Sequence, residues 1–309
     1  MAKGRWPERP AYRPERRRVS YWLLLAFVLL FVCRLCRDKL ELVGNALWLS
    51  LLFELFACGA PLLFFITARR SDRCRMLRLR APASSAVLLF ISAFFALLFG
   101  VVLLSLLTGG FATLGSAAAA YETGQSGGFA TRSAAFLVLC LLPAFLEELL
   151  FRGVTVAEYE RRGMVRAVLT SALLFALIHF DLRNLSAYLF WGALAAALLY
   201  ATESLPLVMA LHALTAGVIL FTHKYTAALY TYTGNVPLLV FLLSVVCLTA
   251  LLFFCRLIAG LYRERDALQL ADPRRAVPMN VQLYTLIDAL TDPMILLCFA
   301  LSIAGFILF

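Results

Sequence analysis

Residues 145–152 read FLEELLFR and place Glu147, Glu148 and Arg152 inside an otherwise apolar stretch. An ionised side chain at the centre of a bilayer costs about 2.5 to 3.5 kcal/mol even on a lenient scale, so such charges are functional candidates by default. In a helix, Glu148 and Arg152 share one face and neutralise each other. Glu147 points about 100° away and has no partner in its own helix. The rest of the chain must therefore supply what faces Glu147.

The composition places this stretch in a membrane protein. Of the 309 residues, 63% are hydrophobic and only 15% are charged, and apolar runs of about 20 residues recur along the chain. The net charge of +10 comes mainly from Lys and Arg in the short segments between these runs. That distribution fits the positive-inside rule and argues against nucleic-acid binding. We expect a multi-pass integral membrane protein that contacts the lipid bilayer and no nucleic acid.

Hydropathy predicts an all-α fold, a polytopic transmembrane helix bundle with eight spans. The apolar runs cover approximately residues 21–36, 45–68, 85–108, 136–157, 165–180, 185–202, 204–223 and 237–261. Residues 293–309 are a candidate ninth span, although this run is short for a membrane crossing.

Basic residues predict the orientation of the bundle. Residues 1–18 hold seven Lys or Arg, and residues 69–80 hold six Arg. With a cytoplasmic N-terminus, 22 of the 28 Lys and Arg residues fall on the cytoplasmic side. The expected regions are a basic cytoplasmic arm (1–19), two helices with an Arg-rich loop (20–84), the bundle that carries the charged stretch (85–261), and a cytoplasmic segment with a C-terminal hydrophobic helix (262–309).

Two of the three histidines lie inside apolar runs and are the candidates to face Glu147. Glu147 lies about 16 Å from the outer end of its span, while His179 and His212 lie about 20 and 12 Å from the cytoplasmic ends of theirs, so all three fall near one plane. Phe175, one turn before His179, is expected to pack beside its ring. Pro143 removes one backbone hydrogen bond near Glu147 and predicts a kink that opens this helix to water.

A carboxylate and an imidazole that meet around one water molecule can remove its proton and direct it at a carbonyl carbon. A second imidazole can donate to the developing oxyanion. A buried pair of Glu148 and Arg152 would add a fixed local charge. The constellation therefore predicts a hydrolase.

Three motifs carry a more specific resemblance: Glu-Glu-x-x-x-Arg at 147–152, Phe-x-x-x-His at 175–179, and His212 on the third element. Their order, spacing and helical context resemble the CPBP family of intramembrane endopeptidases, over about residues 85–255. That family includes CAAX prenyl endopeptidases and the bacteriocin-processing and self-immunity proteins of bacteria. The resemblance implies an endopeptidase of the bacterial plasma membrane that cuts a membrane-associated protein or peptide, and we expect the cut near the cytoplasmic face.

The same resemblance assigns the roles of the site residues. Glu147 and His179 would activate water, and His212 would belong to the oxyanion pocket. Glu148 and Arg152 would complete the catalytic set, with Phe175 supporting the ring or the substrate.

One position departs from the family pattern. The family has Asn or Asp four residues after the third-motif histidine, where this chain has Ala216. Loss of one oxyanion donor costs about 10² in rate, and Thr215 or Asn184 are the candidates to replace it. The alternative is therefore a weak or inactive family member that acts as a peptide-immunity or adaptor protein.

A metal is the second open choice. Glu147, His179 and His212 form an acceptable three-ligand zinc set, but no His-Glu-x-x-His motif is present and no second-shell carboxylate is evident. We expect a metal-free glutamate and histidine mechanism without a cofactor, and zinc is the alternative.

Two further readings concern residues outside the motifs. In a transporter, Glu54, Glu147 and Arg152 would line a path, but the chain lacks internal repeats. For Glu54 itself we expect a snorkelling or locally paired carboxylate. Cys33-x-x-Cys36 is expected to be structural. The sequence leaves the oligomeric state open.

Overall fold

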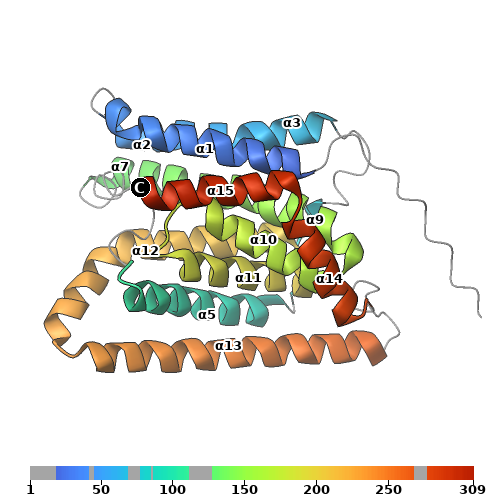
Figure 1. The fold of residues 1–309 in the computed structure, drawn as a ribbon. Helices are drawn as coiled ribbons and strands as arrows, with labels where there is room; N and C mark the ends of the chain where they lie inside the picture. Colours follow the sequence, from blue (N-terminus) through green and yellow to red (C-terminus); the bar gives the residue numbers. More distant parts are fainter. Residues whose placement is uncertain (1–18, 42–44, 69–76, 85, 111–126, 268–276) are drawn as a thin grey trace, which may run out of the picture.

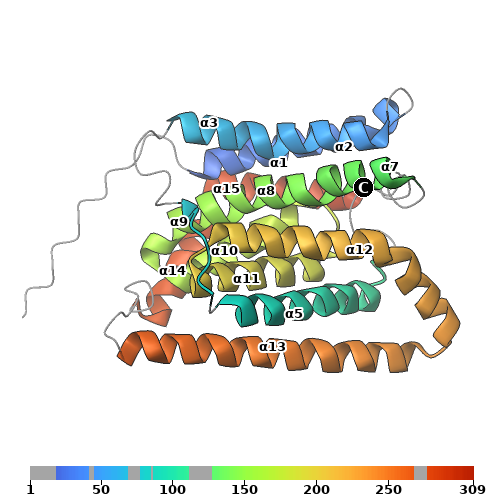
Figure 2. The ribbon, with the colours of Figure 1, turned by 180° about the vertical axis from the view of Figure 1, so that it is seen from behind.

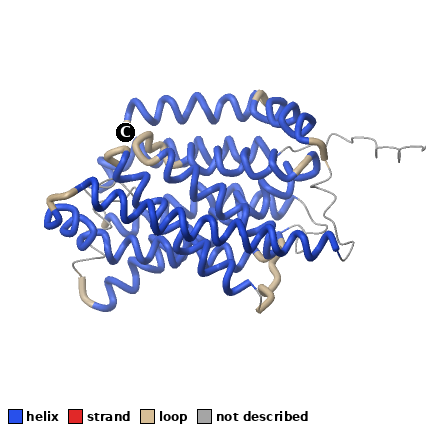
Figure 3. The backbone as a smooth tube through the Cα atoms, turned by 90° about the horizontal axis from the view of Figure 1, so that it is seen from below, coloured by secondary structure: helices blue, strands red, loops and turns tan. Residues whose placement is uncertain are grey.

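The computed structural model describes residues 19–41, 45–68, 77–84, 86–110, 127–267 and 277–309, and every regular element in these ranges is a helix. Figure 3 shows the chain as helices joined by short loops. The predicted all-α class is confirmed.

The described helices follow one another along the chain. They are α1 (Val19–Glu41), α2 (Ala46–Glu54), η1 (Leu55–Gly59), α3 (Ala60–Ala68), α5 (Ala86–Leu107), α7 (Phe129–Phe136), η3 (Leu137–Leu141), α8 (Leu142–Glu148), η4 (Leu149–Thr155), α9 (Val156–Tyr159), η5 (Glu160–Arg162), α10 (Met164–Ile178), α11 (Leu185–Thr202), α12 (Leu205–Thr233), α13 (Val236–Ala267), α14 (Met279–Leu290) and α15 (Pro293–Leu308). Three of them, η1, η3 and η4, are wider π-helical segments set within longer apolar helices.

Within the described ranges, seven helical spans are long and apolar enough to cross a membrane, and the number is eight if one bent pair is counted as a span. A polytopic bundle of this size confirms the predicted fold class, whereas the cytoplasmic N-terminus stays a prediction. Two of the predicted membrane spans are not single helices of full membrane length. The fifth, α10, has only 15 residues, or about 22 Å of helix against a hydrocarbon core of about 30 Å. The ninth run, α15, forms a pair with α14 that bends by 67°.

The helices pack in layers around α10 and α11 (Figures 1 and 2). One outer layer holds α1, α2 and α3, with α15 beside α1, and the opposite side holds α5 and α13. In the 18-residue apolar stretch of α11, 61% of the residues are buried inside the bundle, whereas in that of α13 only 11% are buried. Because α11 is apolar on all faces and buried, it belongs to the core, and α13 presents most of its apolar surface outward, to the lipid of a membrane.

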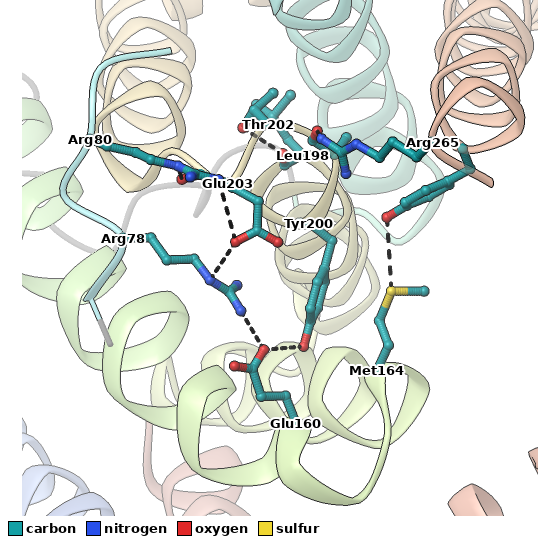
Figure 4. A network of polar contacts seen from close by, with 11 residues as sticks. Arg78, Arg80, Glu160, Met164, Leu198, Tyr200, Thr202, Glu203 and Arg265 are labelled. Atoms are coloured by element: carbon teal, nitrogen blue, oxygen red, sulfur yellow. Dashed lines mark hydrogen bonds and ion pairs between the residues drawn. The ribbon is translucent and has the colours of Figure 1, made fainter. Parts of the chain in front are cut away.

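An ion network lies at one end of the bundle. This end, which we call the arginine end, holds the start of α1, the end of α3, η5, the end of α11 and the start of α12 (Figure 1). There Arg78 forms ion pairs with Glu160 and Glu203, and Tyr200 donates a hydrogen bond of 3.1 Å to Glu160 (Figure 4). Arg80 donates to the backbone carbonyl of Glu203 at 2.8 Å. This network ties the segment 77–84 to η5 and α11.

Candidate active site

A cavity of about 160 Å³ lies between six helical regions and contains Glu147, His179 and His212 in its wall. A water molecule needs about 10 to 15 Å³ of such volume, so the cavity has room for several. The three predicted side chains therefore line one cavity. The remaining wall residues are Leu30, Arg34, Arg37, Ser50, Phe53, Glu54, Cys58, Val138, Leu139, Pro143, Ile178, Tyr188, Trp191, Ala216 and Ile219.

Glu148 lies behind the cavity and joins two partners. Its Oε1 accepts a hydrogen bond from Arg152 Nη1 at 3.1 Å and another from His212 Nδ1 at 2.7 Å. The side chains of Glu148 and Arg152 are both fully buried. The predicted helical pair is therefore present, and the structure adds His212 to it. Removing one member of such a buried pair leaves an uncompensated charge, so these three residues form one unit.

Aromatic rings hold Arg152 and His179 in place. The Arg152 guanidinium carbon lies 4.1 Å from the centre of the Phe175 ring, within range of a cation–π interaction. Phe175 meets the His179 ring edge-on at 4.8 Å, as the spacing predicts. The flat stacking partner of His179 is Tyr188, at 3.8 Å and 15°. His179 is thus held between two rings from different helices.

The backbone sets the tautomer of His179. Its Nδ1 lies 2.7 Å from the carbonyl oxygen of Phe175, and because a carbonyl only accepts, Nδ1 carries the proton and donates. In the neutral ring Nε2 then keeps its lone pair. Because α10 ends at Ile178, well short of a full membrane crossing, His179 follows within the bundle and lines the cavity. A basic nitrogen is therefore available on an oriented ring.

The Glu147 carboxylate, in contrast, has an oxygen without a hydrogen-bond partner among the described residues. Its side chain is 12% exposed, and Oε2 makes no hydrogen bond with any described residue. This oxygen lies 4.0 Å from Nε2 of His212. Oε1 of Glu148 thus has two hydrogen-bond partners, whereas Oε2 of Glu148 and Oε2 of Glu147 have none among the described residues.

The helix that carries both carboxylates is continuous, and it has a π-helical turn just before Pro143, where the sequence predicted a kink. Residues Phe129–Arg162 form one span. Just before Pro143, the Leu142 N–H bonds to the Leu137 carbonyl, five residues back. A wide turn accommodates a residue without an N–H. Pro143 lines the cavity four residues before Glu147, so this turn still lies at the cavity wall.

Residues 129–218 match the family model described as Rce1-like, type II CAAX prenyl endopeptidase. This confirms the predicted resemblance. The matched segment is narrower than the 85–255 expected from the motifs, but it contains Glu147, His179 and His212 together with the other predicted site residues. No curated protein and no solved structure gave a match. The Rce1-like match supports a CAAX-type intramembrane protease.

Several wall residues lie outside the Rce1-like segment and escaped sequence reasoning. Arg34 and Arg37 come from α1, and Glu54 comes from α2. Glu54 was expected to snorkel or to pair locally, and it does hydrogen-bond Cys58, one turn on. It also lines the cavity, and its Oε1 has no partner among the described residues. The sequence signal for Glu54 was a carboxylate midway along an apolar run. Only the packing of α2 against α8 brings Glu54 near Glu147.

Ala216, where the family has an amide, lines the cavity. Asn184 does not replace that amide, because its Nδ2 donates to the Gly110 carbonyl at 2.9 Å and to Asp181 at 2.7 Å, away from the wall. Thr215 is fully buried and is not a wall residue. Trp191 is on the wall with its ring 4.8 Å from that of His212, and its indole N–H has no partner in the described ranges. Sequence reasoning missed this donor because aromatic residues are common in apolar helices.

The side chains as placed do not fit a metal ion. Among the described residues, no group of three or more His, Cys, Asp or Glu side chains is arranged to hold one. Nδ1 of His179 and Nδ1 of His212 are both engaged in hydrogen bonds, which leaves Nε2 of each ring open. Glu148, which bonds His212, is also the kind of carboxylate that supports a histidine ligand and that the sequence did not show. The zinc set of Glu147, His179 and His212 therefore stays an alternative.

The cavity wall extends from the middle of the bundle toward the end opposite the arginine end. On α1 its wall residues are Leu30, Arg34 and Arg37, at the end of the span that starts at Val19. On α11 they are Tyr188 and Trp191, near the start of Leu185–Thr202. If the arginine end is cytoplasmic, as the charge distribution predicts, this part of the wall lies toward the outer half of the membrane. The expected cut near the cytoplasmic face stays a prediction.

Proposed function

We propose that the protein is an intramembrane endopeptidase that hydrolyses a peptide bond in a membrane-associated protein or peptide. The observation that carries the proposal is a carboxylate with an unpaired oxygen, Glu147 Oε2, in the wall of one cavity with two oriented imidazoles. The Rce1-like match supports the same reaction class.

In this mechanism Glu147, assisted by Nε2 of His179, takes one proton from a water molecule in the cavity. The water oxygen bonds to the substrate carbonyl carbon, and the carbonyl π electrons move to its oxygen. When the tetrahedral intermediate collapses, the C–N bond breaks and the proton held by Glu147 passes to the leaving amine. The products are a new carboxylate and a new amine.

His212 and Trp191 are the proposed donors to the oxyanion. Nδ1 of His212 donates to Glu148, so donation from Nε2 requires a proton on both ring nitrogens. Glu148 also accepts a hydrogen bond from the buried Arg152 and so fixes the orientation of the His212 ring. The indole N–H of Trp191 supplies a second donor where Ala216 cannot.

The test is a comparison of native protein with Glu147→Gln in reconstituted vesicles. The substrate is a peptide that ends in a prenylated C-a-a-X sequence, and cleavage is read by mass spectrometry. Membranes that express each form are compared in parallel for new protein termini. Termini that depend on Glu147 support the proposal, and identical termini from both forms refute it. Chelator treatment of the purified protein and a zinc measurement decide the metal alternative.

A second function has one observation in its favour. Ala216 removes the amide donor of the family pattern, as expected for an inactive member that confers peptide immunity or assembles partners. The same Glu147→Gln variant separates the two, because an adaptor keeps its phenotype without this carboxylate.

We place the protein in a plasma membrane, bacterial as the immunity branch of the family implies, with the arginine end in the cytoplasm. A substrate would then reach the cavity from the outer half of the bilayer. Single cysteines at Arg132 and Arg161, in a chain whose native cysteines are replaced, test this orientation. A membrane-impermeant thiol reagent added to intact cells should label only the cysteine at 132, and labelling of only the one at 161 would reverse the topology.

A further inference from the structure

The bent helix pair α14 and α15 lies outside the segment that matches the Rce1-like family model, and the proposed reaction uses none of its residues. The two helices meet at an angle of 67°, and Asp292 begins α15 by accepting a hydrogen bond of 2.9 Å from the Met294 N–H. While α15 runs along the bundle, α14 crosses its arginine end (Figures 1 and 2). A helix that crosses the end of a membrane-spanning bundle lies near the depth of the lipid headgroups.

An apolar row and a polar row lie side by side on the exposed surface of α14. Both rows repeat every four residues, which places their members along one side of a helix. The apolar row is Met279, Leu283 and Ile287, and the polar row is Asn280, Tyr284 and Asp288. Val281 is the one exposed aliphatic side chain of α14 outside the apolar row. A helix with these two edges is suited to the boundary between acyl chains and headgroups, where a tyrosine ring also fits.

The third side of α14 packs on α10, the helix that leads to His179. Gln282 is buried, and its Oε1 accepts a hydrogen bond of 2.8 Å from the Val165 N–H in the first turn of α10. At the other end of α10, Ser302 of α15 donates to the Leu177 carbonyl at 3.3 Å. The bent pair therefore contacts α10 at both of its ends.

We propose that α14 is an interfacial helix whose apolar row contacts the acyl chains of the leaflet at the arginine end, and that it thereby holds α10 at a fixed depth. The 15 residues of α10 span about 22 Å and cannot reach both surfaces of a hydrocarbon core of about 30 Å. The depth of α10, and of His179 after it, is therefore set by the helices that hold it.

Lipid is the partner that fits this surface. The apolar row continues within a few residues into α15, an apolar helix that belongs to the same candidate span. Three side chains also fall far short of the roughly 800 Å² that each partner buries in a stable protein interface. The lipid contact does not depend on the proposed function, whereas its consequence for catalysis rests on it.

Labels at Leu283 and Tyr284 test the lipid contact. Each residue is replaced by cysteine in a chain without its native cysteines, labelled with a fluorophore, and measured in vesicles with nitroxide lipids of known depth and with aqueous iodide. The lipid quenchers should act on position 283 and iodide on position 284, with depths that differ by up to about 10 Å, the width of a helix. A label at Leu248, on the exposed side of α13, is the lipid reference. Iodide quenching at both positions, lipid quenching at both, or protection of 283 from both quenchers by a protein partner would each overturn the proposal.

A label at Leu182, in the exposed turn after α10, reports the depth of that helix. Leu283→Glu places a charge in the apolar row and should shift this label by about 3 Å, half a helical turn. Tyr284→Glu adds the same charge to the polar row and is the matched control, which should leave the label in place.

Gln282→Leu removes the acceptor of the Val165 N–H without changing the apolar row. It should shift the label at 182 while a label at 283 keeps its depth. The fixed depth of α10 is refuted if either Leu283→Glu or Gln282→Leu leaves the label at 182 at its native position. None of these measurements uses turnover, so a native protein that cleaves nothing would refute only the endopeptidase function.

Discussion

The two ends of this bundle hold two ion networks that differ in how completely their carboxylates are bonded. At the arginine end, Glu160 accepts from Arg78 and Tyr200, and Glu203 pairs with Arg78 and Arg80 (Figure 4). At the cavity, Oε2 of Glu147 and Oε1 of Glu54 have no partner among the described residues.

The difference separates structural from functional charge. Buried polar groups are normally hydrogen-bonded, and exceptions need an explanation. The ion pairs at the arginine end fix a loop to two helices, and these contacts occupy the carboxylates of that end. In the cavity, the unpaired acids keep lone pairs for water or substrate. The comparison predicts that substitutions at the two ends change different measured quantities.

The largest expected effect is on turnover by Glu147→Gln. The amide keeps the size of the side chain but cannot take a proton, so kcat should fall by about 10³-fold or more. Because Glu147 has no described partner on Oε2, the melting temperature in detergent should change little. A variant that melts far below the native protein would instead place Glu147 among the structural charges.

Next in size is Glu148→Gln, one residue away. This change leaves Arg152 buried without its carboxylate and His212 without its acceptor, and a broken buried pair costs about 3 to 5 kcal/mol. Denaturation should therefore occur at a clearly lower temperature, and activity should also be lost. Equal stability of the two glutamine variants would contradict the contrast between paired and unpaired neighbours.

A smaller effect is expected at the arginine end. Arg78→Gln removes the partner of Glu160 and Glu203, which are less than one-fifth exposed, and should lower stability by about 1 to 3 kcal/mol. Turnover per folded molecule should stay near the native value because the network lies away from the cavity. Loss of turnover without loss of stability would show that the two ends are coupled.

Sequence reasoning recovered the residues of the site that helix spacing connects. Glu148 and Arg152 are four apart, as are Phe175 and His179, and both pairs are in contact. The meeting of Glu147 with His179 and His212 followed from estimates of depth. Neither helix spacing nor depth predicted the Glu148–His212 hydrogen bond, because the rotation of one helix against another is set by tertiary packing.

The errors have the same origin. Glu54, Arg34 and Trp191 lie on the cavity wall because of tertiary contacts. Glu54 stands out in the sequence as a carboxylate in an apolar run, but no local pattern marks Arg34 or Trp191. Asn184 seemed available as a donor, yet it closes the turn after α10. The apolar run at 165–180 has the composition of a full span, but the helix ends at Ile178. Segments 1–18 and 69–76, on which the predicted topology depends, lie outside the described residues.

The smallest expected effect concerns Trp191. Trp191→Phe keeps the ring beside His212 and removes only the N–H, a hydrogen bond of about 1.5 kcal/mol, so kcat should fall about tenfold with KM nearly unchanged. Ala216→Asn restores the amide of the family pattern on the same wall and should recover most of this loss when combined with Trp191→Phe. A Trp191→Phe protein with native kcat would exclude the indole as an oxyanion donor. His212 would then be the sole donor proposed, and Ala216→Asn alone should raise kcat above the native value.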